Sequence, residues 1–145
     1  MRRDNTKTGL VGEFYVLAQL NARGLIGTLT LGHTKGVDIL VRNPENDKLF
    51  QVEVKTSTGK KFSWILHQSA ENRTSETLIY IFVHLVDLKT LPSFFIVPAK
   101  DVSHYIYTSH RNWLAGGNRK DTTMRKFIIE PHDPKNYQDK WDVFK

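Results

Sequence analysis

Residues 37–56, VDILVRNPENDKLFQVEVKT, contain two strand-like segments on either side of a turn. The segments, residues 37–42 and 48–56, are rich in the β-branched and aliphatic residues that are typical of strands. Between them, residues 43–47 (NPEND) form a turn cluster that cannot extend a strand. The simplest interpretation of the whole stretch is an antiparallel hairpin.

This hairpin brings carboxylates to opposing positions. If the turn is centred between residues 45 and 46, the numbers of opposing residues sum to 91, and Asp38 lies across from Glu53. Alternate side chains of a strand share one face, so Gln51, Glu53 and Lys55 project together. A one-residue bulge would turn one strand over and break this arrangement.

Opposing carboxylates predict a bound cation. Two negative charges at facing positions repel each other and destabilise a sheet. A cation converts the repulsion into coordination, and hard ions such as Mg²⁺ prefer carboxylate oxygens. Glu13 adds a third carboxylate at the edge of the packed face of a predicted helix. Burying it without a partner is costly, and a metal or a basic side chain would remove that cost.

That helix is predicted over residues 7–23, with Gly24 as its C-terminal stop. Apolar residues recur along it at helical spacing, so one face is expected to pack on a core. The residues of this expected face are Leu10, Val11, Phe14, Leu17 and Ala18.

The rest of the pattern predicts an α/β layered domain. Residues 78–86, LIYIFVHLV, are nearly all apolar, as expected of a central strand buried on both faces. The 145 residues suffice for one domain and not for two ordinary ones, so a single domain over residues 1–145 is expected. Further strands are predicted at residues 25–31, 94–97 and 127–129, and further helices at residues 63–73, after Pro98 through Ile106, and at 136–144.

Composition narrows the class of protein. The absence of cysteine excludes disulfides and Cys-ligated zinc, and is compatible with a reducing cytoplasm. The longest apolar run is too short to cross a membrane, and no signal-peptide pattern follows the basic N-terminus. A net charge of +6 and a pI near 9.6 favour a polyanionic partner.

Residues 36–38 (GVD) followed by residues 53–55 (EVK) resemble the signature of the PD-(D/E)XK nucleases. Residues 12–13 (GE) on the preceding helix are similar to the arrangement in Holliday-junction resolvase-like members. The resemblance implies a restriction-endonuclease-like αβββαβ core, with a mixed central sheet flanked by helices. Val37 stands where the family's proline would be, a departure that bears on the subgroup more than on the fold.

The resemblance also implies an activity, the hydrolysis of DNA phosphodiester bonds with Mg²⁺ or Mn²⁺. Asp38 and Glu53 would hold the ion, with Glu13 as an additional or water-mediated ligand. Lys55 would orient the attacking water or stabilise the phosphorane charge, and Gln51 would hydrogen-bond that water or DNA. These roles agree with what a metal does in such a site, which is to polarise the phosphate and lower the pKa of water.

Four basic residues are candidates for contacts with the DNA backbone, although solvated surface explains each of them nearly as well: Lys60, Lys61, Arg119 and Lys120. Three functions stay open at this point. The first is a metal-dependent endonuclease, which the retention of all four polar site residues favours. The second is an inactive nuclease-like module for nucleic-acid binding or assembly. The third is an interaction protein whose carboxylates pair with Lys or Arg.

A homodimer is also expected. So small a core offers little surface to grip a duplex, and two-fold pairing is the commonest association of soluble chains. The C-terminal third carries Trp113, Tyr137, Trp141 and Phe144, and aromatic residues are enriched in interface cores. The alternative is that these side chains pack onto their own domain.

Overall fold

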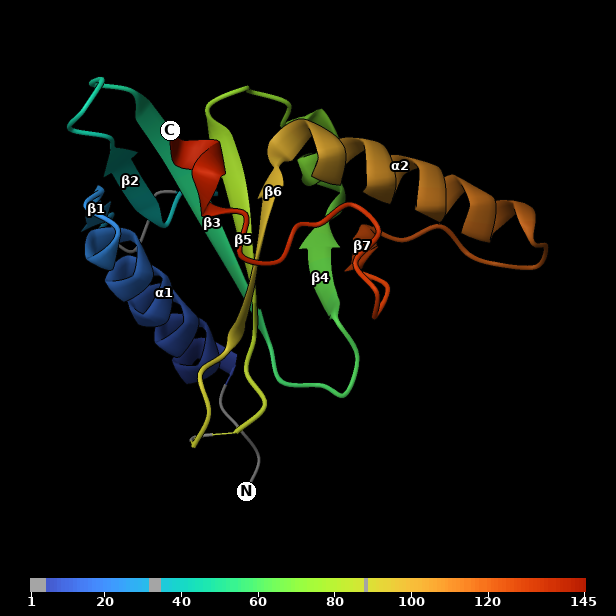
Figure 1. The fold of residues 1–145 in the computed structure, drawn as a ribbon. Coiled ribbons are helices and arrows are strands. Elements are labelled where there is room, and N and C mark those ends of the chain that lie inside the picture. The colour runs from blue at the N-terminus through green and yellow to red at the C-terminus, as the bar shows by residue number, and fades with distance from the viewer. Residues whose placement is uncertain (1–4, 32–34, 88) are drawn as a thin grey trace.

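The computed structural model of the chain describes residues 5–31, 35–87 and 89–145. It is a mixed α/β fold, centred on a five-stranded sheet with the strand order β1-β2-β3-β5-β6 (Figure 1). A smaller sheet joins β4 to β7. No helix in the described part of the chain is long and apolar enough to cross a membrane. The elements are α1 (Asn5–Ala22), β1 (Ile26–Leu29), β2 (Ile39–Arg42), β3 (Leu49–Ser57), β4 (Ser63–His67), the 3₁₀ helix η1 (Gln68–Asn72), β5 (Leu78–His84), β6 (Ser93–Pro98), α2 (Ala99–Ala115), β7 (Met124–Ile128) and the 3₁₀ helix η2 (Trp141–Phe144).

The predicted hairpin and its register are confirmed. β2 and β3 are antiparallel, and their pairs run from Arg42 opposite Leu49 to Ile39 opposite Val52. The two numbers in each pair sum to 91, so the turn is centred where the sequence placed it. The paired ladder ends at Ile39, one residue after Asp38. Asp38 therefore lies at the mouth of the hairpin, where β2 begins.

β5 is the buried strand that the apolar run predicted. It lies between β3, to which it is parallel, and β6, to which it is antiparallel. All seven of its residues are buried. Their side chains alternate between two hydrophobic clusters, one on each face of the sheet. β3 and β5 thus run side by side through the middle of the molecule.

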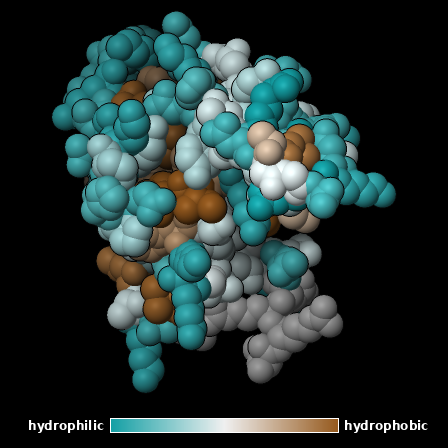
Figure 2. Space-filling model, turned by 90° about the vertical axis from the view of Figure 1, so that its right-hand side faces the viewer, coloured by the Kyte–Doolittle hydropathy of each residue, from teal (hydrophilic) through white to brown (hydrophobic). Residues whose placement is uncertain are grey.

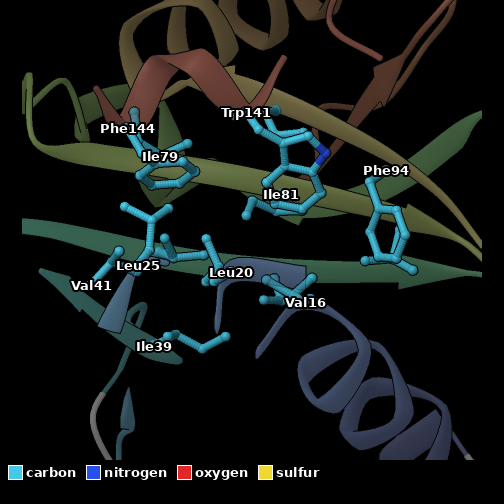
Figure 3. Packing of buried hydrophobic residues seen from close by; sticks show 14 residues of the cluster. Val16, Leu20, Leu25, Ile39, Val41, Ile79, Ile81, Phe94, Trp141 and Phe144 are labelled. Carbon is cyan, nitrogen blue, oxygen red and sulfur yellow. The ribbon is translucent and has the colours of Figure 1, made fainter. Parts of the chain in front are cut away.

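α1 and the C-terminal segment cover the first face of the sheet. Val16 and Leu20 of α1 pack with Ile79 and Ile81 of β5, while Trp141 covers the same cluster from the C-terminal side (Figure 3). Gly24, at φ +80°, ends the helix as predicted. Two backbone N–H groups that follow the helix cap the carbonyl oxygens of its last turn: Gly24 donates to Asn21 and Leu25 donates to Leu20.

Most of the predicted packing face of α1 is wrong, since only Leu17 of its five residues packs against the first cluster. Leu10 and Phe14 are about half exposed, at 49% and 53%, and Val11 and Ala18 are exposed as well. The buried line is instead Gly12, Val16 and Leu20. Gly12 carries no side chain and so adds nothing to an apolar pattern, yet the helix backbone there lies close to Thr56 of β3.

Residues 136–144 do not form the predicted helix, because only η2 is helical there. Trp141 and Phe144 are buried in the first cluster, with ring centroids 5.6 Å from Phe94 and 5.2 Å from Phe50 respectively. The half-buried Tyr137 donates its hydroxyl to Asp101. These three aromatic side chains therefore pack onto their own chain, whereas Trp113 is 43% exposed, and the homodimer remains a prediction.

β4, β7 and α2 cover the second face of the sheet. The helix predicted over residues 63–73 is wrong, since this stretch forms β4 and η1. Its side chains alternate in burial, with Trp64 and Leu66 inside and Ile65 half exposed, and β4 pairs with β7. The Trp64 indole N–H donates to the Val83 carbonyl oxygen and ties β4 to the central sheet. The alternating burial along residues 63–67 has a period of two, which is the signal of a strand.

The approach of α1 to β3 can be tested at Gly12. A methyl group added there would lie 1.8 Å from the Thr56 Oγ1 atom. We expect Gly12→Ala to destabilise the fold by about 1–3 kcal/mol, the usual cost of overpacking. The matched control is Gly9→Ala in the same helix, where a new Cβ meets nothing within 4 Å. That variant should be stabilised slightly by better helix propensity. Equal effects of the two substitutions in chemical denaturation would contradict the close contact.

Candidate functional site

Glu53 lies in the middle of β3 with its carboxylate buried; its side chain is only 9% exposed. Alternation along the strand places it on the same face as Lys55, whose Nζ atom lies 2.8 Å from Glu53 Oε1. The second carboxylate oxygen accepts a hydrogen bond from the Arg73 guanidinium. An unpaired charge at this depth would be strongly destabilising, so the two cations are what allow Glu53 to be buried.

Asp38 is held beside Glu53 by the backbone of β3. Its Oδ2 atom accepts a hydrogen bond of 2.7 Å from the Val54 N–H, and its own N–H donates to the Val52 carbonyl oxygen at 2.8 Å. These two bonds fix Asp38 at the end of the β2–β3 ladder. The two bonds join Asp38 to Val52 and Val54, the residues on either side of Glu53, so the direct pairing of Asp38 with Glu53 stays a prediction.

The carboxylates of the site affect one another electrostatically. Burial is the main cause that raises the pKa of Asp38 above its usual value; the Val54 N–H lowers this pKa, and the Glu53 charge raises it. The pKa of Glu13 is also raised, first by burial and next by the negative charge of Asp38, while Lys55 lowers it. Glu13 on α1 is therefore within electrostatic reach of Asp38 and Lys55.

Arg73 is a member of this group that sequence reasoning missed. Besides Glu53, its guanidinium donates to the Gly36 carbonyl oxygen and lies 3.4 Å from the Tyr80 hydroxyl. Gly36 has a φ of +76°, and a Cβ there would come within 2.6 Å of the guanidinium. In the sequence Arg73 is one basic residue in a polar connection, and no local pattern links it to Glu53.

This group offers donor atoms that a metal ion prefers, but their present arrangement does not form a metal site. Within residues 5–31, 35–87 and 89–145, no three His, Asp or Glu side chains are grouped so that they could hold a metal. Glu53 is engaged by Lys55 and Arg73, and Asp38 by the Val54 N–H. Carboxylate oxygens are nevertheless the ligands that Mg²⁺ and Mn²⁺ prefer. Burial is the first cause that raises the pKa of both Asp38 and Glu13, and a bound cation would offset that cost.

The other candidate residues fall in two places. Gln51 is exposed on β3, on the same face as Glu53, and Lys60 and Lys61 are exposed in the turn after β3. Arg119 and Lys120 instead follow the C-terminal end of α2, which projects away from the central sheet (Figure 1). The structure does not bring these last two to the carboxylates.

Comparisons with known proteins identify the fold. No protein family and no curated protein matches the sequence. The structure is similar to that of a bacterial homing endonuclease, I-Ssp6803I, with a TM-score of 0.55 over 97% of this chain and 91% of that one. The chain has a nuclease-like α/β fold. At 12% sequence identity the likeness shows the fold alone, so the chemistry must be argued from the site.

The charge of Glu13 gives a test by pH. Because the folded state raises its pKa, ionising Glu13 costs stability as pH rises from its ordinary value of 4.5 through the higher folded value. Glu13→Gln should therefore raise the melting temperature near pH 7, by up to about 3 °C for a partly exposed group. Below about pH 4, where both states are protonated, the difference should vanish.

The matched control for this test is Glu45→Gln in the exposed turn of the hairpin. A thermal scan at both pH values should show no pH-dependent gain for that variant. A Glu13 variant that is less stable than wild type at neutral pH would show that Glu13 has a favourable partner rather than repulsion.

Proposed function

We propose that this protein is a metal-dependent endonuclease of the PD-(D/E)XK type that hydrolyses DNA phosphodiester bonds. The observation that carries the proposal is the placement of Asp38 and Glu53 at the mouth of one hairpin, with the Lys55 amine 2.8 Å from Glu53. The fold shared with a homing endonuclease supports it. A carboxylate pair with a neighbouring lysine is a donor set suited to phosphoryl chemistry.

In this proposal Asp38 and Glu53 would hold one Mg²⁺ or Mn²⁺ ion, and Glu13 would act through a bound water. An ion held there polarises the scissile phosphate and lowers the pKa of water. The Asp38 carboxylate is oriented by the Val54 N–H, so one of its oxygens already has a fixed direction. Lys55 is about one-third exposed and presents its ammonium where negative charge develops on the phosphate.

The surroundings of the site suit a long polyanion. The chain carries a net charge of +6, and Lys60 and Lys61 are exposed just beyond the β3 residues of the site. Two grooves of about 450 and 770 Å³ lie elsewhere, one beside Trp141 and one between α2 and β7. Figure 2 shows the side of the molecule toward which α2 projects in Figure 1. Its surface is mostly hydrophilic, with a few hydrophobic residues between. Neither of these two grooves is lined by Asp38 or Glu53.

A second function is supported by one specific observation. Glu53 is already neutralised by Lys55 and Arg73, and a site closed by such ion pairs needs no metal. The protein would then be a catalytically inactive nuclease-like module that binds nucleic acid or takes part in assembly. Metal binding by Asp38 and Glu53 distinguishes the two functions, because only the enzyme requires it.

A nuclease assay on branched, single-stranded and duplex DNA tests the activity. With Mg²⁺ or Mn²⁺ we expect cleavage by the wild type and a loss of at least about 10²-fold for Lys55→Ala, since one charge-stabilising group is removed from the transition state. The matched control is Lys89→Ala, at an exposed lysine in the loop after β5, which should cleave normally. Folded protein that cleaves no DNA with either metal, or equal activity of Lys55→Ala and wild type, would contradict the assignment.

A further inference from the structure

Arg73 joins three segments that are distant in the sequence. It follows η1, and its guanidinium contacts Glu53 in β3, the Gly36 carbonyl oxygen in the connection before Asp38, and Tyr80 in β5. The side chain is 28% exposed. The Cζ atom of the guanidinium lies 5.8 Å from the centre of the Tyr80 ring. These contacts place a second cation beside the proposed metal ligands.

The position of Arg73 is fixed by the elements that cover the second face of the sheet. Ser103 of α2 donates its hydroxyl to the Glu71 carbonyl oxygen, and the buried Arg125 of β7 pairs with the Glu71 carboxylate. The Arg73 N–H closes the end of η1 on the Ala70 carbonyl oxygen. A short helix tied on both sides therefore delivers the guanidinium to Glu53.

The charges of the site show that a metal ion would compete with Arg73 for Glu53. Glu13, Asp38 and Glu53 contribute three negative charges, and Lys55 and Arg73 two positive ones. An ion that used the Glu53 oxygen now bonded to Arg73 would compete with Arg73 for it. The two cations would also repel each other at this distance.

We propose that Arg73 is the cation that Glu53 exchanges for a divalent metal, and that the released guanidinium then binds a phosphate oxygen of the DNA. This inference rests on the proposed function. The bond to the Gly36 carbonyl oxygen uses a different guanidinium nitrogen from the bond to Glu53, so one anchor remains when the other is given up. A planar guanidinium matches phosphate oxygens, and here it would stay beside the reacting centre as a positioning residue.

Gly36 is the local condition for this arrangement. Its missing side chain leaves the space that the guanidinium fills, since a Cβ would come within 2.6 Å of it. The positive φ of Gly36 also directs its carbonyl oxygen at Arg73, in a conformation that other residues rarely adopt. The glycine thus leaves room for the Arg73 guanidinium beside Glu53.

The test is Mn²⁺ binding to the full chain without DNA, measured by calorimetry. Arg73→Gln should bind Mn²⁺ up to about fivefold more tightly than wild type, because an ion pair worth up to about 1 kcal/mol no longer competes. Asp38→Asn removes one of the two proposed ligands, so its Mn²⁺ affinity shows what loss of the site looks like in this measurement. The matched control is Arg42→Gln, which removes an exposed arginine paired with Asp47 in the hairpin and should leave Mn²⁺ affinity unchanged.

A second measurement separates this role from a structural one. DNA binding is followed by fluorescence anisotropy with Ca²⁺, another oxygen-binding ion, and again with a chelator. With Ca²⁺, Arg73→Gln should bind a duplex about three- to tenfold more weakly, and its salt dependence should fall by about one phosphate contact. With the chelator the variant should match wild type, because Arg73 is then engaged by Glu53. Arg73→Lys keeps the charge, loses the fork, and replaces the glutamine variant if that one does not fold.

The outcomes distinguish this inference from the proposed function. Tighter Mn²⁺ binding with weaker DNA binding in Ca²⁺ supports the exchange. Mn²⁺ binding by wild type that is equal or weaker in the Arg73 variants overturns the exchange and leaves the metal site standing. Mn²⁺ binding by Arg73→Gln but not by wild type overturns both the exchange and the proposed function, because Glu53 then keeps its ion pair with Arg73 in the natural protein. Absence of Mn²⁺ binding in every variant overturns both.

Discussion

The buried carboxylate of Glu53 is the constraint on which the rest of the site depends. A negative charge in the middle of a sheet, between strands that are otherwise apolar, is tolerated only with charged partners. Lys55 supplies one of them from two residues along the same strand. The other, Arg73, comes from a segment that the central sheet does not contain. The small β4–β7 sheet and α2 hold that segment in place through Glu71.

Three separate parts of the chain thus meet at the mouth of the β2–β3 hairpin: the hairpin itself, α1 and the segment that carries Arg73. The hairpin provides Asp38, Glu53 and Lys55 through its register, which its turn determines. The close approach of α1 at Gly12 brings Glu13 to the same end. The charges that result do not balance, since three carboxylates face two cations. This imbalance is the physical reason to expect that the site binds a further cation.

The sequence predicted those features that local patterns determine. Alternating residues and the turn at residues 43–47 were enough to give the hairpin and its register. The apolar run gave β5, and Gly24 gave the end of α1. Most of the predicted packing face of α1 was wrong, because the helix contacts β3 at Gly12, which has no apolar side chain.

Features that depend on long-range contacts escaped prediction. β4 was taken for a helix although its burial alternates, because the strand is defined by its pairing with β7, some sixty residues away in the sequence. Arg73 was missed because its bonds to Gly36 and Glu53 span 37 and 20 residues, and no spacing rule covers such distances. The nuclease-like fold follows from the structure, whereas the metal and the activity rest on the chemistry of the carboxylates.

The location of a bound metal tests the central claim most directly. Crystals of the wild-type protein equilibrated with Mn²⁺ can be measured at a wavelength where manganese scatters anomalously. The proposal predicts one strong anomalous peak about 2.2 Å from carboxylate oxygens of both Asp38 and Glu53, with the Arg73 guanidinium turned away from Glu53. A crystal that contains Mn²⁺ at other positions, while Arg73 and Lys55 still enclose Glu53, would contradict the metal site.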